Sequence, residues 1–441
     1  MEAISICEHE MHLEHERPRD AARPVPRPRP RGRILIIVEN LPVPFDKRVW
    51  NEANALTRAG YQVTVICPVG KGYEARSETI NGIRILRHPL PLEGKGPLGY
   101  ALEYAGTLVW ECALALKVAL GPGFDVLQAC NPPDTIFLIG MLFKLFGKRF
   151  VFDHHDINPE LYLAKFGKKD LFYRLMLFLE RMTFRTADIS LATNMSYRDI
   201  ALSRGGMAPD RVFVVRSGPD LRKLQPVEPN PQLKEGRQYL VGYVGVMGKQ
   251  EGLTYLLEAA RHLVVEKQRK DVLFVLIGSG TEFEELKTYA RTLGISDAVR
   301  FTGRIPDKEL IEYLSTADVC VNPDEANEMN DKSTMNKVLE YMALGKPVVQ
   351  FDLLEGRRSA EDASVYARRN DPLDLGEKIL ELLEDPERRQ SMGSVGRHRI
   401  QTQLSWEFSE QVLLKAYEVV FPRPHVQKSL KKAHSLRFDV T

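Results

Sequence analysis

The sequence of 441 residues predicts an α/β protein built from two Rossmann-like, doubly wound parallel-sheet domains. Two continuous apolar runs, residues 33–39 and 239–245, each open a series in which strands alternate with amphipathic helices. Between the two series, residues 216–238 are rich in Pro and charge and show no periodicity. Strands of parallel sheets are covered on both faces, which explains the unbroken apolar runs. We therefore expect two domains whose carboxyl strand ends face a cleft.

The first series begins with a strand, a proline-containing loop and a helix that Asp46 caps and Gly60 ends. Further strands are predicted at 61–67, 83–87, 124–128, 149–153, 188–192 and 212–215. Helices are predicted at 98–120, 135–146 and 171–185 and near Ser196, and residues 155–169 are predicted to form a loop. The helix at 98–120 contains Glu103, Glu111 and Lys117, which indicates packing on a sheet rather than a membrane span.

The second series predicts strands at 239–245, 272–277, 299–302, 317–322 and 347–351. Its helices are expected at 253–267, after residue 280, and at 308–314, 333–344, 373–384, 386–403 and 405–420, with a loop at 323–331. Residues 1–32 are expected to be a disordered Pro/Arg-rich tail without the apolar segment of a signal peptide. The predicted domains are 33–218 and 239–404, with a linker at 219–238, a helix at 405–421 packing back on the first domain and a basic tail at 422–441.

The helix at 333–344 is the most informative segment. Ser333 and Thr334 are candidate N-caps and Gly345 follows its end. Helical spacing puts Met335, Val338, Leu339 and Met342 on a buried face and Ser333, Asn336, Lys337 and Glu340 on the opposite, polar face. A helix N-terminus suits a phosphate, and Glu340 lies where a carboxylate could accept hydrogen bonds from a ribose. The alternative is a surface helix with solvated charges.

Composition excludes some classes of function. A formal net charge of +2 gives no electrostatic case for nucleic acid binding. Five scattered cysteines indicate free thiols in a reducing compartment and no metal site. His9, His12 and His15 are read as part of a polar tail rather than as metal ligands. We expect a cytoplasmic protein.

The predicted strand ends of the two series carry different chemistry. Those of the second are rich in glycine and cations, as a phosphate site requires. Those of the first include His155 with Asp156, a candidate general base or positioning donor, although a loop histidine held by backbone is the alternative. Cys130 is expected to be a buried, inert thiol rather than a nucleophile. No GxGxxG or Walker motif is present.

Four segments together resemble a known family: PVPFDKRVW at 42–50, VMGKQEG at 246–252, FTGRIP at 301–306, and EYMA followed by GKPVV at 340–349. The sequence from Arg33 to Phe421 is similar to the retaining, nucleotide-sugar-dependent glycosyltransferases of family 4, which have the GT-B fold. It looks most like the branch that makes bacterial exopolysaccharide, O-antigen or capsule.

The resemblance implies transfer of a hexose-type sugar from a UDP- or GDP-linked donor to a glycan or lipid-linked acceptor, without a metal or other cofactor. Catalytic residues would be His155, Asp156 and Lys249. Acceptor-binding residues would be Pro44, Phe45, Asp46, Arg48 and Asn131. Donor-binding residues would be Gly245, Gly248, Lys249, Gly278, Arg304, Ile305, Lys332, Ser333, Thr334, Asn336 and Glu340.

The sequence departs from the family pattern at Val246, Glu251 and Lys332, which stand where the family has Arg, Lys and Glu, and at Cys130, where His is common. Two alternatives therefore stay open: a GT-B-like epimerase or phosphorylase, and a non-catalytic nucleotide-sugar-binding protein. Basic and aromatic residues also suggest peripheral contact with the inner face of the plasma membrane, against the alternative of a solvated basic helix. They are Lys144, Lys148, Lys165, Lys168, Lys169, Phe172 and Tyr173.

Overall fold

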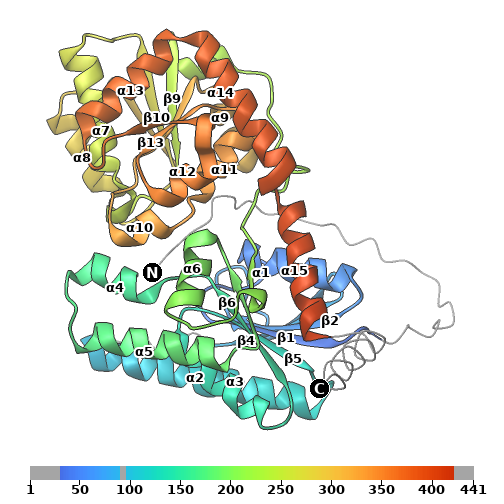
Figure 1. Cartoon of the computed structure of the whole chain (residues 1–441). Helices are drawn as coiled ribbons and strands as arrows, with labels where there is room; N and C mark the ends of the chain where they lie inside the picture. The colour runs from blue at the N-terminus through green and yellow to red at the C-terminus, as the bar shows by residue number, and fades with distance from the viewer. Residues whose placement is uncertain (1–29, 90–95, 422–441) are drawn as a thin grey trace, which may run out of the picture. The chain divides into compact units, whose positions relative to one another are not determined.

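The computed structural model describes residues 30–89 and 96–421 (Figure 1). The histidines of the N-terminal tail, most of the predicted disordered segment 1–32 and the basic tail 422–441 lie outside these residues. The chain divides into two compact units. The C-terminal unit comprises Arg216–Ser409, and the N-terminal unit comprises the described residues up to Val215 together with those from Glu410 onward.

The N-terminal unit contains an eight-stranded sheet in the order β3-β4-β2-β1-β5-β6-β7-β8. The strands are β1 (Arg33–Val38), β2 (Gln62–Pro68), β3 (Ser77–Ile80), β4 (Ile83–His88), β5 (Val126–Cys130), β6 (Arg149–His154), β7 (Ile189–Ala192) and β8 (Val212–Val214). All neighbours pair in parallel except β3, a short edge strand antiparallel to β4 that the sequence did not predict. In β1 every residue after Arg33 is buried, as expected for a strand with neighbours on both sides.

The helices of this unit are α1 (Lys47–Arg58), α2 (Gly96–Leu120), α3 (Phe137–Lys144), α4 (Asn158–Phe166), α5 (Leu171–Thr186) and α6 (Met195–Ser203). Asp46 caps α1 as predicted, because its Oδ1 accepts from the Val49 amide at 3.0 Å. The predicted loop at 155–169 is wrong, since α4 forms there with Pro159 in its first turn and Gly167 in the left-handed region at its end. Only Pro159 and Glu160 of α4 are buried, so it lacks the apolar periodicity that reveals most helices.

Three helices of the N-terminal unit share one face of its sheet. The connections β4 to β5, β5 to β6 and β6 to β7 all advance in the same direction across the sheet. Right-handed crossovers therefore place α2, α3 and α5 on the same side. Consistent with this, α2 contacts β2 and β4, α3 contacts β5 and β6, and α5 contacts β6 and α3. Among the described residues, no helix is both long enough and apolar enough to cross a bilayer.

The C-terminal unit contains a six-stranded parallel sheet in the order β11-β10-β9-β12-β13-β14. Its strands are β9 (Tyr239–Val244), β10 (Val272–Ile277), β11 (Val299–Gly303), β12 (Val319–Asn322), β13 (Val348–Phe351) and β14 (Ser364–Ala367). The order reverses between β9 and β12, which is the Rossmann arrangement with its switch point at these two strands. β14 was not predicted from the sequence.

Its helices are α7 (Leu253–Arg261), α8 (Phe283–Thr292), α9 (Asp307–Thr316), α10 (Glu328–Lys332), α11 (Asn336–Ala343), α12 (Leu354–Ala360), α13 (Pro372–Glu384) and α14 (Pro386–Arg399). α10 lies partly in the predicted loop 323–331, and α12 was not predicted. The last described helix, α15 (Trp406–Val420), begins in this unit, and from Glu410 onward it belongs to the N-terminal unit. There the Tyr417 hydroxyl donates to Gln128 of β5, and the Tyr417 ring lies 6.0 Å from that of Tyr61.

Candidate functional site

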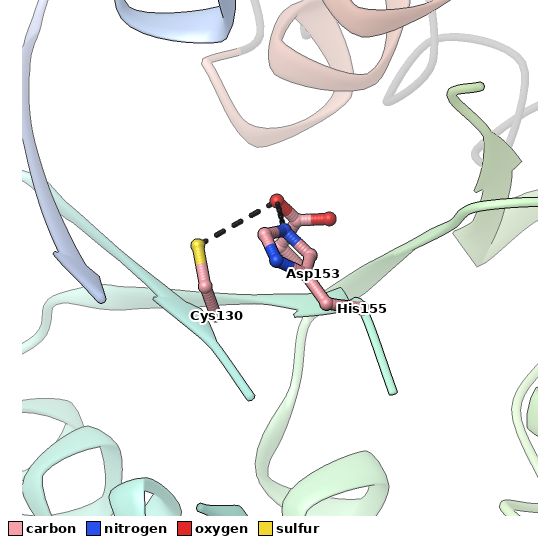
Figure 2. A group of neighbouring side chains, drawn as sticks. All are labelled: Cys130, Asp153 and His155. Carbon is pink, nitrogen blue, oxygen red and sulfur yellow. Dashed lines mark hydrogen bonds and ion pairs between the residues drawn. The ribbon is translucent and has the colours of Figure 1, made fainter. Parts of the chain in front are cut away.

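The candidate site of the N-terminal unit is a buried charge cluster at the carboxyl ends of β5 and β6. Arg48, near the start of α1, donates from Nη2 to Oδ1 of Asp153 at 2.6 Å and from Nη1 to the Val215 carbonyl at 2.6 Å. The His155 Nε2 lies 2.7 Å from Oδ2 of Asp153 and 3.0 Å from Nε of Arg48. Figure 2 shows the His155 ring and the Cys130 thiol directed at the Asp153 carboxylate.

The charges of this cluster fix the direction of hydrogen bonding. Burial alone would raise the pKa of Asp153, but Arg48 and His155 hold it far below its ordinary value. Burial would likewise lower the pKa of His155, and the charge and hydrogen bond of Asp153 outweigh it and raise that pKa. Nε2 cannot both accept from Arg48 and donate to Asp153. Because the ionised Asp153 favours the protonated nitrogen, Nε2 donates to Asp153.

This geometry corrects the predicted pairing of His155 with Asp156. The imidazole contacts Asp153, whereas Asp156 enters the turn through its backbone. Asn131 organises that turn: its Oδ1 accepts from the His155 amide at 2.7 Å and the Asp156 amide at 3.2 Å, and its Nδ2 donates to the Asp156 carbonyl at 2.7 Å. Asn131, predicted to bind the acceptor, is therefore a buried support for the His155 turn.

Three further residues complete the cluster, and no pattern in the sequence predicts them as a group. The Gln128 amide donates to Glu52 at 2.6 Å and to Asp153 at 3.1 Å, and it accepts from Tyr417. Burial raises the pKa of Glu52 to about 8, with a further contribution from the charge of Asp153. Two features of the sequence could have revealed part of this cluster. Glu52 follows Arg48 by four residues, and Asp153 comes at the end of an apolar run. No local signal links Tyr417 to this cluster.

Cys130, Asp153 and His155 place three possible metal-ligand atoms within 4.8 Å of one another, within the described part of the chain (Figure 2). The donor set does not fit a metal ion, because the Arg48 guanidinium already neutralises Asp153 and lies beside the imidazole. Burial also raises the pKa of the Cys130 thiol well above its ordinary value, which opposes the thiolate that a metal needs. This agrees with the predicted buried, inert thiol.

The remaining predicted acceptor residues lie in the loop before α1. Asp46 is buried at the helix cap, Arg48 is buried in the charge cluster, and Pro44 and Phe45 are partly exposed. The Phe45 ring lies 6.4 Å from the Tyr73 ring. Of this predicted set, Pro44 and Phe45 leave the most surface accessible to a substrate.

In the C-terminal unit, the predicted glycines Gly245 and Gly278 lie in two turns that pack against each other. The Gly245 amide donates to the Ile277 carbonyl and the Met247 amide to the Ser279 carbonyl, both at 3.0 Å, so the two turns after β9 and β10 continue the sheet pairing. A Cβ on Gly278 would stand 1.9 Å from the Gly245 carbonyl oxygen, at a φ of +133°. Gly278 is thus required by backbone packing, and Gly248 has only the flexible Gln250 side chain nearby.

The prediction that Lys337 lies on a polar, exposed face of its helix is wrong, because the residue is buried. Its side chain is 8% exposed, and Nζ lies 2.6 Å from Glu251 and 2.7 Å from Asp324. It also lies 5.2 Å from the centre of the Tyr243 ring. Burial raises the pKa of Asp324 to about 7, although Lys337 opposes that rise. Glu251, which stands where the family has a lysine, therefore pairs with a lysine supplied by α11.

The predicted helix start at Ser333 is also wrong. Ser333 ends α10, with its hydroxyl donating to the Met329 carbonyl at 2.8 Å, and α11 begins at Asn336 without a side-chain cap. Thr334 lies between the two helices, where Arg216 reaches its hydroxyl at 3.5 Å. Lys332 is paired with Glu328 one turn earlier at 3.0 Å. Because the α11 amides have no side-chain cap, this helix start can receive an anion.

The other predicted donor residues differ in how far their side chains are exposed. Glu340 is half-buried on α11 and Asn336 is exposed at its first turn. Lys249 and Arg304 are exposed, and Ile305 packs partly against the core. Asp331, next to Lys332, accepts from the Leu354 amide at 3.0 Å and from Arg369 at 2.7 Å, so its carboxylate helps to position α12.

Comparison with known proteins gives two family models that together span both units. "Glycosyltransferase Family 4" matches residues 46–223, and "Glycosyl transferases group 1" matches residues 225–399. The alpha-maltose-1-phosphate synthase of Mycolicibacterium smegmatis is 27% identical over 305 residues, which are 63% of this chain and 74% of that protein. The D-inositol 3-phosphate glycosyltransferase of Corynebacterium jeikeium is 29% identical over 43% of this chain and 45% of its own. This chain spans about half the length of several such relatives.

Solved structures show the same fold at low sequence identity. Sucrose-phosphate synthase from Thermosynechococcus elongatus has a TM-score of 0.70 at 19% identity, covering 88% of this chain and 99% of that one. Anabaena Alr3699/HepE, solved in complex with UDP-glucose, has a TM-score of 0.66 at 15% identity, covering 88% and 100%. These matches show the fold, with two Rossmann-like α/β units in one chain.

Proposed function

We propose that this chain, which belongs to the family 4 glycosyltransferases of the GT-B fold, moves a hexose-type sugar from a nucleotide sugar to a glycan or lipid-linked acceptor, with retention of anomeric configuration. The observation that carries the donor part is the uncapped start of α11, with Arg216 beside Thr334 and with Glu340 one turn further along the helix. Relatives solved with UDP and UDP-glucose support a UDP-linked donor. The polysaccharide role follows from the resemblance of the sequence motifs.

In the proposed reaction the bond between the anomeric carbon and the donor diphosphate breaks, and an acceptor hydroxyl oxygen bonds to that carbon. The acceptor proton passes to the departing diphosphate. The α11 amides and the exposed cations Lys249 and Arg304 stabilise the charge on the diphosphate, so the proposal includes no metal or other cofactor. Glu340 accepts hydrogen bonds from the ribose.

His155 is assigned to the acceptor side of the proposed reaction. Because Asp153 raises the pKa of His155, the imidazole is better suited to donate a hydrogen bond to a sugar hydroxyl than to remove a proton. The buried Arg48 and Asp153 hold the ring, and Asn131 holds the backbone of the same turn. Asp156, Pro44 and Phe45 are the further candidates for contact with the acceptor.

A second candidate function, nucleotide-sugar binding without transfer, is favoured by one observation. The cation that replaces the family lysine, Lys337, is held by two carboxylates and therefore brings no net positive charge to a diphosphate. Proteins of this kind would bind the donor and produce no glycosylated product.

The experiment is thermal stabilisation by UDP, GDP, ADP and their sugar conjugates, followed by turnover assays with the stabilising donor. A ligand at about a hundred times its dissociation constant adds roughly 2.7 kcal/mol to the free energy of unfolding. We expect one nucleotide class to protect the wild type, Glu340→Ala to lose that protection, and Glu328→Ala, on neighbouring α10, to keep it. Protection without turnover over a panel of acceptors would favour the second candidate. Absence of protection by any nucleotide would reject both.

A further inference from the structure

One side of the N-terminal unit exposes an unusual number of large apolar side chains. The described part of α2 buries Thr107, Glu111, Ala115 and Val118 against the sheet. Its opposite stripe is apolar and exposed, with only Lys117 charged. The stripe contains Val109 at 68%, Trp110 at 50%, Leu116 at 41% and Leu120 at 88% exposure. An outward stripe of this kind on a water-soluble helix is normally polar.

The neighbouring helices on the same face repeat this pattern. At the end of α3, Leu145 is 83% and Phe146 is 68% exposed, and on α5 Leu171 is 79% and Phe178 is 57% exposed. Cations alternate with these side chains, at exposed positions 174, 181 and 185 on α5. Lys165 is exposed in the last turn of α4, and Lys168 and Lys169 are exposed between α4 and α5. We call the exposed residues of α2, of residues 138–149 and of residues 165–185 the apolar–basic face.

Basic residues dominate the exposed charge of the apolar–basic face, and among the described residues Asp170 is its one exposed acid. Within the described parts of α2, α3 and α5, every exposed charged residue is a Lys or Arg, although the whole chain has 61 basic and 59 acidic residues. The acids Glu111 and Glu180 point inward and are buried. Asp170, between α4 and α5, is used as the N-cap of α5. Two of the cations predicted to contact a membrane also interact within the protein. Lys144 lies 3.2 Å from Asp188, and the Lys148 ammonium lies over the Phe124 ring.

We propose that the apolar–basic face docks on an anionic lipid bilayer, with α2, α3 and α5 lying along the membrane surface and their apolar side chains entering the headgroup region. Leu, Phe and Trp side chains on surface helices supply apolar area, and each nearby Lys or Arg adds about 1 kcal/mol of attraction to anionic lipid. A second copy of the chain does not fit as well, because a two-fold interface would bring the basic residues of one face against those of the other. A nucleic acid is also a poorer fit, because it would contact the basic residues without burying the apolar side chains.

The inference does not depend on the donor site, because the apolar–basic face belongs to the N-terminal unit and the proposed donor residues belong to the C-terminal unit. It extends the proposed function by giving the protein a surface that would keep it next to a lipid-linked acceptor.

The test is flotation of the full chain with vesicles of phosphatidylglycerol plus phosphatidylcholine, and of phosphatidylcholine alone, at low and physiological salt. We expect binding to the anionic vesicles that weakens with salt. The variant Leu145→Glu/Phe178→Glu should bind about tenfold or more weakly. Its control, Leu373→Glu/Val395→Glu, changes exposed side chains of the C-terminal unit and should bind as the wild type does. Lys168→Gln/Lys169→Gln should lose the salt-sensitive part of binding, unlike Lys270→Gln/Lys308→Gln.

Thermal stabilisation by nucleotides is measured on the same samples. A variant that is still stabilised is folded, so its loss of vesicle binding reports on docking. A wild type that binds vesicles without nucleotide stabilisation would count against the donor proposal alone. A folded wild type that does not float with anionic vesicles at low salt would overturn the inference. Equal loss of vesicle binding in Leu145→Glu/Phe178→Glu and in Leu373→Glu/Val395→Glu would also overturn it. A concentration-dependent dimer that Leu145→Glu/Phe178→Glu abolishes, without vesicle binding, would assign the face to a second copy instead.

Discussion

His155 Nε2 lies 2.7 Å from the Asp153 carboxylate, although only one residue separates them in the chain. His154 between them is wholly buried. The strand β6 ends at His154, and the turn held by Asn131 brings the next side chain back onto Asp153. The pair therefore belongs to one turn. Arg48 and His155 lower the pKa of Asp153, and Asp153 in turn raises the pKa of His155.

We predict that Asp153→Asn lowers the pKa of His155, because the neutral amide no longer stabilises the imidazolium. The measurement is an NMR titration of the His155 ring. Asp156→Asn is the matched control and should cause a smaller change, because the His155 ring contacts Asp153 directly. Equal changes in the two variants would contradict the assigned pairing.

Glu52 should make folding stability depend on pH. Its pKa in the folded protein is about 8, above the ordinary value of 4.5, so the folded state retains a proton that the unfolded state releases. Between these two values its contribution to stability falls as pH rises, by at most about 1.4 kcal/mol per pH unit. Glu52→Gln should flatten the curve of unfolding free energy against pH from about 5 to 8.

The control for Glu52 is Glu284→Gln, a side chain 77% exposed. It should leave the pH dependence as in the wild type. If denaturant unfolding gives the same pH slope for Glu52→Gln as for the wild type, Glu52 does not carry the proton.

Lys337→Met should destabilise the C-terminal unit by about 3–5 kcal/mol, because the buried Asp324 and the partly buried Glu251 are left as neighbouring carboxylates without their cation. Lys332→Met removes a partly exposed pair with Glu328 and should cost about 0.5 kcal/mol or less. Urea unfolding monitored in the C-terminal unit compares the two. Adding Glu251→Gln and Asp324→Asn to Lys337→Met should recover part of the loss, and a further decrease would show that the three charges do not act together.

Gly278→Ala should cost about 3 kcal/mol or more, since the new Cβ would meet the Gly245 carbonyl oxygen and the backbone cannot give way without separating β9 from β10. Gly72→Ala is the control: its φ is +82°, but nothing lies within 4 Å of the added atom, so only backbone strain of about 1 kcal/mol is expected. Thermal unfolding measures both. Similar melting temperatures for the two variants would show that the turns after β9 and β10 can separate.

The misread elements of the fold share a cause. The sequence of α4 predicts a loop because its stabilising contacts are specific rather than periodic: buried Glu160 pairs at 2.9 Å with Arg204, the residue that follows α6. Helical spacing predicts a polar face for Lys337 because it cannot reveal Asp324, which follows β12, or Glu251, which follows β9. The residue type of Ser333 predicts a helix cap, yet its hydroxyl donates to the Met329 carbonyl of the preceding helix, α10.

The sequence by itself determined the α/β class, most of the strands, the Asp46 cap and the family, because apolar runs, helix caps and short motifs are local properties of the chain. Only the tertiary structure decided which charges meet: His155 with Asp153, Lys337 with Glu251 and Asp324, and Tyr417 with Gln128. It also decided that the outward stripes of α2, α3 and α5 share one face of a sheet. The physical reason is that the pKa values and burial of such groups depend on neighbours brought together by strand order and crossover handedness.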